Sequence, residues 1–93
     1  MQLDDDLLPI LVMLRAAYPE GLLPNEEYRA LLVVLQEDLP EYPLGQVVAE
    51  FMNEEAVVVI NDAAAAASIL RPTEDEVQRV RLKLVANGWE PLA

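Results

Sequence analysis

The amino-acid sequence predicts an all-α protein, a compact bundle of about five short helices in a single domain. Three observations support this fold class. The chain has 93 residues, enough for one domain with its own hydrophobic core. Seven prolines divide it into segments of helical length. Within these segments the apolar residues recur every three or four positions, which is the period of a helix.

The first helix is expected at residues 6–18, with Asp6 as its N-cap. Pro9 lies in the first turn, where its missing N–H has no intrahelical partner. Apolar residues cover more than one face of this helix, and Arg15 is the one charged residue inside it. We therefore expect the helix to lie in the centre of the fold or against a partner.

The second helix is expected at residues 25–39, with Asn25 as its cap. One stripe of this helix carries Tyr28, Leu31, Leu32, Leu35 and Leu39. Val33 and Val34 fall outside the stripe, so they are candidates for an exposed apolar contact surface.

The third and fourth helices are expected at residues 43–54 and 62–71. Between them, the run Ala56–Ile60 is rich in β-branched residues and has strand propensity. No second strand-like run exists to pair with it, so we favour a buried connector or a helix end over a strand that pairs with another chain. Asn61 or Asp62 is the expected cap of the fourth helix, which runs through five alanines.

The fifth helix is expected at residues 73–87. Thr73 and Glu76 have the spacing of a capping box, and Asn87-Gly88 is typical of a left-handed helix end. Trp89 follows at the position where such an end makes an apolar contact, and we expect that contact on the last turn of the helix.

The stretch RAAYPEGLLPNEEY, residues 15–28, joins the first two helices. Tyr18-Pro19-Glu20-Gly21 has proline and glycine where a type I turn favours them. Arg15, Tyr18 and Tyr28 remain as candidates for a small polar site around a carboxylate or phosphate. The favoured interpretation is that both tyrosines are core residues with hydroxyls that reach water.

The fifth helix contains an arginine within its apolar stripe. At 100° per residue, Arg81 projects between Val77 and Val85. We expect its guanidinium to pair with an acid from residues 1–62, and the alternative is an anchor for an anionic ligand. Arg79 and Lys83 lie on a face of the usual solvated kind.

The composition excludes most enzyme chemistry. The chain has no cysteine and no histidine, which removes thiolate nucleophiles, imidazole bases and the usual zinc and haem ligands. Ser68 and Thr73 are possible hydroxyl nucleophiles, but the only bases that could activate them are carboxylates or a lysine. We therefore expect no enzymatic activity, no cofactor and no metal.

The net charge is −11, and residues 1–62 carry all of it, with thirteen acids against Arg15 and Arg29. Such a field repels phosphates, so we expect no nucleic-acid binding. A further alternative is that the acidic residues 1–62 mimic nucleic acid and bind a basic partner. No apolar run approaches the roughly 20 residues of a membrane span, and the acidic start differs from a secretory signal. A cytoplasmic location without membrane association is expected.

Several segments together resemble a family of small actinobacterial, mainly mycobacterial, proteins known as domain of unknown function 3349. They are Leu14–Gly21, Tyr28–Leu32, Pro72, Asp75–Leu84 and Gly88-Trp89. The resemblance implies an all-helical cytoplasmic domain without an established activity, and it draws attention to Arg15, Tyr18, Arg79 and Arg81. It implies no catalytic or ligand residues.

Two hypotheses for function follow. The first is a protein–protein interaction or self-association module that uses the apolar surface of the first helix, with Val33 and Val34 or the run 57–60 contributing. The second is a regulatory domain that binds a small anionic ligand between the first and fifth helices through Arg15 and Arg81.

Overall fold

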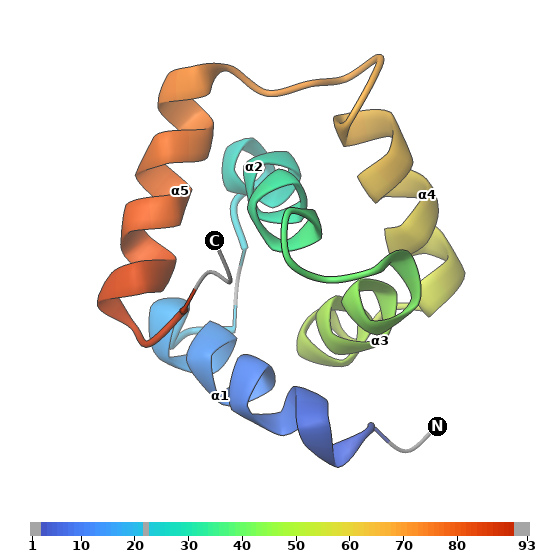
Figure 1. The fold of residues 1–93 in the computed structure, drawn as a ribbon, viewed down its shortest axis with the longest axis vertical. Helices are drawn as coiled ribbons and strands as arrows, with labels where there is room; N and C mark the ends of the chain where they lie inside the picture. Colours follow the sequence, from blue (N-terminus) through green and yellow to red (C-terminus); the bar gives the residue numbers. More distant parts are fainter. Residues whose placement is uncertain (1–2, 22, 91–93) are drawn as a thin grey trace.

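The computed structural model describes residues 3–21 and 23–90, which fold into one bundle of helices (Figure 1). The elements are a 3₁₀ turn at Asp5–Leu7, α1 (Leu8–Ala17), α2 (Asn25–Gln36), α3 (Glu41–Met52), α4 (Ala56–Ala66) and α5 (Glu74–Ala86). No β-strand occurs among the described residues. The prediction of an all-α bundle of about five short helices is confirmed.

Helix α2 lies at the centre of the bundle. In Figure 1 it is seen nearly end-on, with α5 on one side and α4 on the other, and it also contacts α3. Helix α1 packs against α3 and α5 and closes the bundle from below. Every residue of Ala30–Leu35 is buried. Because successive helical residues are 100° apart, six in a row cover the whole circumference, so α2 has no outer face along this stretch.

The prediction that Val33 and Val34 form an exposed contact surface is wrong. Their side chains are only 6% and 1% exposed. The stripe from Tyr28 to Leu39 can cover only one side of α2, whereas α2 contacts α3, α4 and α5. Two valines outside the stripe therefore pack against a second layer of helices and belong to the core.

Two predicted N-caps are also wrong. Helix α1 begins at Leu8, after the 3₁₀ turn that contains Asp6, and α2 begins at Asn25 itself after Pro24. No side chain caps either start. The extended conformation of Pro24 lets its carbonyl accept the first backbone bonds of α2, from the N–H groups of Glu27 and Tyr28, without a polar side chain.

Helix α4 begins at Ala56 and thus includes the whole run Ala56–Ile60 that has strand propensity. Asn61 and Asp62 lie inside the helix and do not cap it. Helix α3 ends just before, at Asn53, whose φ of 57° is left-handed. In a helix, backbone N–H groups find acceptors within the same segment of the chain. A strand would need a partner strand, so the run forms a helix in spite of its strand propensity.

The fifth helix has both of its predicted end signals. The capping box between Thr73 and Glu76 is present, and Gly88 has a φ of 106°. The backbone N–H of Trp89 donates to the carbonyl of Leu84 at 2.9 Å, which closes the helix end. The indole ring is buried and extends beyond the last turn of α5 to α1.

Candidate functional sites

The turn between α1 and α2 places Tyr18 in a polar cluster, here called the Tyr18 cluster, together with Glu27 and Lys83. The turn itself is closed by the N–H of Gly21, which donates to the Tyr18 carbonyl at 2.9 Å. The Tyr18 hydroxyl donates to Glu27 Oε1 at 2.9 Å, and Lys83 Nζ donates to the same oxygen at 2.7 Å. Lys83 Nζ also lies 4.6 Å from the centre of the Tyr18 ring, a cation–π distance. The cluster joins α1, α2 and α5.

Ionisation in the Tyr18 cluster follows from these contacts. Partial burial by itself raises the pKa of Glu27, but the hydrogen bonds from Lys83 and Tyr18 outweigh it, and the net pKa is lowered. Burial, followed by the hydrogen bond to the Glu27 carboxylate, raises the pKa of Tyr18. Both groups therefore keep their ordinary charge at neutral pH, as expected for a structural contact.

Tyr28 belongs to a different contact. Its hydroxyl donates to Asp62 Oδ2 at 2.7 Å and so connects α2 with α4. Burial and the bond to Asp62 raise the pKa of Tyr28. The Arg15 side chain is exposed on α1, and no hydrogen bond or ion pair of it occurs within the described residues. The structure thus does not bring Arg15, Tyr18 and Tyr28 together in one site.

Arg81 has the acidic partner that the sequence predicted. Its Nη2 lies 2.6 Å from both carboxylate oxygens of Glu37 on the turn after α2, and Nη1 donates to Gln78. The side chains of Arg81 and Glu37 are 30% and 49% exposed, so the pair lies at the protein surface. Arg79 is exposed, and its charge contributes to the lowered pKa of Glu27. Three of the five guanidinium N–H groups of Arg81 are used within the protein, and Glu37 balances its charge, which weakens the attraction of Arg81 for an external anion.

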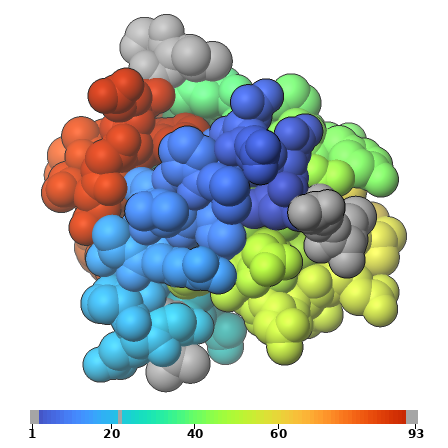
Figure 2. Space-filling view, turned by 90° about the horizontal axis from the view of Figure 1, so that it is seen from below, coloured from blue at the N-terminus to red at the C-terminus, as the bar shows by residue number. Residues whose placement is uncertain are grey.

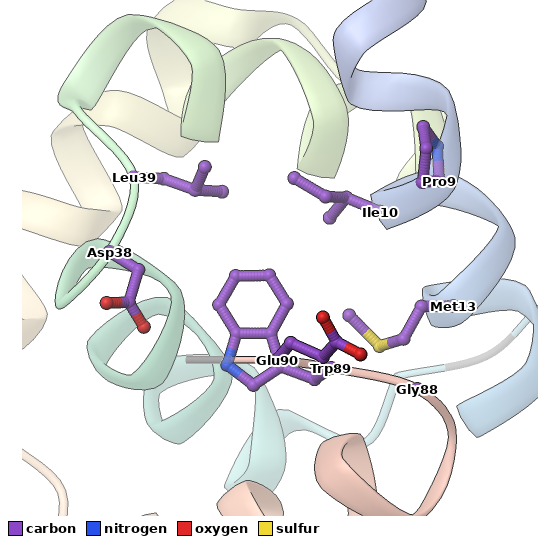
Figure 3. Close-up of a pocket in the computed structure, with 8 residues that line it drawn as sticks. All are labelled: Pro9, Ile10, Met13, Asp38, Leu39, Gly88, Trp89 and Glu90. Carbon is purple, nitrogen blue, oxygen red and sulfur yellow. The ribbon is translucent and has the colours of Figure 1, made fainter. Parts of the chain in front are cut away.

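A cavity of about 290 Å³ lies between α1 and the segment after α5 (Figure 3). Its apolar lining includes Ile10, Met13, Leu39 and Trp89. The charged residues of the lining are Asp38 and Glu90, and neither Arg15 nor Arg81 lines it. The pocket predicted for an anionic ligand was expected between the first and fifth helices at Arg15 and Arg81. None of the residues that line this cavity belongs to α5, and its charged residues are acids. We refer to it as the Trp89 cavity.

The indole of Trp89 lines this cavity. Trp89 is 8% exposed, and its Nε1 is a buried donor with no acceptor among the described residues. An unpaired buried donor costs about 1–3 kcal/mol. In Figure 3 the six-membered ring points towards the space between Leu39 and Ile10, and Nε1 lies on the side of Asp38.

A second feature is the outer face of α4, which is uncharged. From Ala56 to Leu70 the one charged residue is Asp62, whose carboxylate binds Tyr28. We define the α4 face as the exposed residues of this stretch: Val57, Val58, Asn61, Ala64, Ala67, Ser68, Ile69 and Leu70. Val57 is 58% exposed and Ile69 is 89% exposed. The Ser68 hydroxyl is bound to the carbonyl of Ala64, which makes the face still less polar.

The sequence did not predict the Trp89 cavity, because its residues come from three separate segments. One signal in the sequence was the predicted end of the fifth helix, which placed Trp89 directly after it. The apolar residues around the circumference of α1 were a second clue, since Ile10 and Met13 face this cavity. Glu27 and Glu37 were not singled out either, because the many acids of the chain look alike in sequence. Asp62 was expected as a helix cap and not as the partner of Tyr28.

No described helix is both long and apolar enough to cross a membrane. Within residues 3–21 and 23–90, no group of three or more acidic side chains is arranged to hold a metal ion.

The family model DUF3349, described as a protein of unknown function, matches residues 7–93. No curated protein and no solved structure matched the chain. Since the family match spans nearly the whole sequence, including every helix of the bundle, the chain belongs to the DUF3349 family of proteins of unknown function.

Proposed function

We propose that this protein is a small interaction module that associates with a second copy of itself through the α4 face. The observation that supports this is the lack of charge on an exposed helix in a chain with a net charge of −11. The exposed parts of α2, α3 and α5 all carry acids, among them Glu26, Glu50 and Asp75. Two copies repel each other least where their α4 faces meet.

The side chains of the α4 face suit a helix–helix contact. Valines at one end and Ile69 and Leu70 at the other supply apolar area that is otherwise left in water. Between them, Ala64 and Ser68 lie one helical turn apart and are small enough for two backbones to approach closely. A two-fold axis across this face would bury the same residues from both copies, as in most homodimers.

Helix α1 offers a smaller alternative surface. Its apolar residues are mostly buried, and only Leu8 and Val12 among the large ones are well exposed. The anionic-ligand alternative has less support, because Arg81 is bound to Glu37 and the nearby cavity is lined by acids.

Sedimentation velocity over a range of protein concentrations tests the proposal with two matched variants. Val57→Lys lies on the α4 face and Val12→Lys on α1, and the two valines are 58% and 63% exposed. We expect wild type to form dimers at high concentration, and added salt to strengthen them because it screens repulsion between the copies. Val57→Lys should weaken the dimer at least about tenfold, whereas Val12→Lys should leave it unchanged.

Two outcomes would contradict the proposal. A wild-type protein that stays monomeric at every concentration and salt level has no self-association to explain. A dimer that is lost in Val12→Lys but kept in Val57→Lys uses α1 and not α4.

A further inference from the structure

A second, independent surface of the molecule points to a small-molecule ligand. The Trp89 cavity lies at α1, the turn after α2 and the segment after α5, whereas the proposed contact surface lies on α4. In the space-filling view from below, α1 crosses the middle of this side of the molecule, with the end of α5 next to it (Figure 2). The inference therefore does not depend on self-association.

The charges of the cavity select the sign of a ligand. Carboxylates of Asp38 and Glu90 belong to the lining, and no lysine or arginine does. In Figure 3 these two carboxylates lie on either side of the indole of Trp89. The net charge of −11 adds a long-range attraction for cations and a repulsion for anions.

The remaining walls select the shape and polarity of a ligand. Ile10, Met13 and Leu39 provide an apolar lining, and Trp89 adds an aromatic ring. An indole attracts an organic cation through its π-system, and a thioether such as that of Met13 adapts its shape to an apolar group. A bare metal ion would gain nothing from such walls, because hard cations require several oxygen ligands.

We propose that the Trp89 cavity binds a small organic ammonium ion, a primary amine with an apolar body. The apolar body lies among Ile10, Met13 and Leu39, and the ammonium group lies near the carboxylate of Asp38 or Glu90. Aliphatic or aromatic amines of this kind satisfy both halves of the lining, whereas neutral and anionic molecules satisfy only the apolar half.

The single tryptophan of the chain makes the cavity directly observable. Its fluorescence is titrated with three compounds of nearly the same shape. They are cyclohexylmethylamine, cyclohexylmethanol and the carboxylate anion of cyclohexylacetic acid. N-acetyltryptophanamide is titrated in parallel to subtract collisional quenching. We expect a saturable change with the amine, at least about threefold weaker binding of the alcohol, and no saturation with the carboxylate.

Three variants locate the binding. Asp38→Asn and Glu90→Gln should each weaken amine binding about threefold. Glu50→Gln removes the same charge from an exposed position on α3 outside the cavity and should leave the affinity unchanged. If circular dichroism shows that Asp38→Asn does not fold, the exposed Glu90 decides the test by itself.

The proposal is wrong if the alcohol or the carboxylate binds as tightly as the amine, because the cavity is then an apolar site without charge selection. It is also wrong if the amine produces no saturation up to about 10 mM. Equal weakening in Glu50→Gln and Glu90→Gln would assign the effect to the overall charge of the protein and overturn the assigned site.

Discussion

Several polar side chains in this protein bind partners that are far away in the sequence. Arg81 binds Glu37 across 44 positions, and Lys83 binds Glu27 across 56. The need of Arg81 for an acid was predictable, because it projects from an apolar stripe. The identity of that acid was not, since it depends on how α5 lies against α2. Lys83 was expected on a solvated face, but its long side chain reaches Glu27 at the edge of α2.

The Tyr18 cluster predicts a particular dependence of stability on pH. The folded-state pKa of Glu27 is lower than its unfolded value, so Glu27 contributes stability that is complete above an unfolded pKa of about 4.3 and is lost as the pH falls through the folded pKa. Lys83→Met removes the principal hydrogen bond behind this shift. We expect the variant to be less stable by at most about 1 kcal/mol at neutral pH, because Lys83 is partly exposed.

Urea unfolding at a series of pH values, from neutral down to about pH 3, checks this expectation. The stability difference between wild type and Lys83→Met should shrink as the pH falls. Arg71→Met is the control, because it removes one positive charge from an exposed position on the connection before α5. If Arg71→Met shows the same pH-dependent loss, the cause is net charge and not the Tyr18 cluster.

At the scale of elements, the ends of helices were harder to predict than their existence. The capping box of α5 is a local signal and was confirmed, because both of its hydrogen bonds join residues three apart. Helix α4 has no such signal at its start, where Glu55 precedes it without a side-chain cap. What favours its first turn is tertiary packing, since Val59 is fully buried and Ile60 lies against Gly45 of α3. The helix or strand propensity of individual residues does not reveal such tertiary packing.

The contact between α3 and α4 predicts a reversal in the effect of one substitution. A Cβ added at Gly45 would lie 2.6 Å from Ile60 Cγ1, so the two helices meet without room for a methyl group. Gly45→Ala raises helix propensity by about 1 kcal/mol, but overpacking costs about 1–3 kcal/mol. We expect a net loss of stability in the wild-type background.

In an Ile60→Ala background the contact with Ile60 is gone, and the Ala56 carbonyl oxygen, 3.3 Å from the added Cβ, remains. Gly45→Ala should then stabilise the protein by at most about 1 kcal/mol. Thermal and urea unfolding of the four proteins of this double-mutant cycle measure both effects. A stabilising effect of Gly45→Ala in wild type would mean that Ile60 moves aside at no cost, and that the close approach does not hold the two helices in place.

At the scale of the whole molecule, the fold class followed from the sequence, whereas the surfaces did not. Helical periodicity and proline spacing are local, so they predicted an all-α bundle. Whether an apolar residue is exposed depends on how many other helices surround its own helix. Local sequence patterns do not reveal this number. Val33 and Val34 became core residues for this reason. Val57 and Val58 are exposed, in a run for which a buried connector or a helix end was favoured and which was also a candidate for the contact surface.

The central position of α2 also determines how the molecule opens. Amide hydrogens exchange with solvent only when their hydrogen bonds break, and a helix enclosed by others cannot open without the separation of its neighbours. The amides of residues 31–35 should therefore exchange the slowest, and only through unfolding of the entire bundle. Their exchange rates, measured by NMR in deuterated water, should give the same free energy as urea unfolding, so five adjacent amides report the global stability under native conditions.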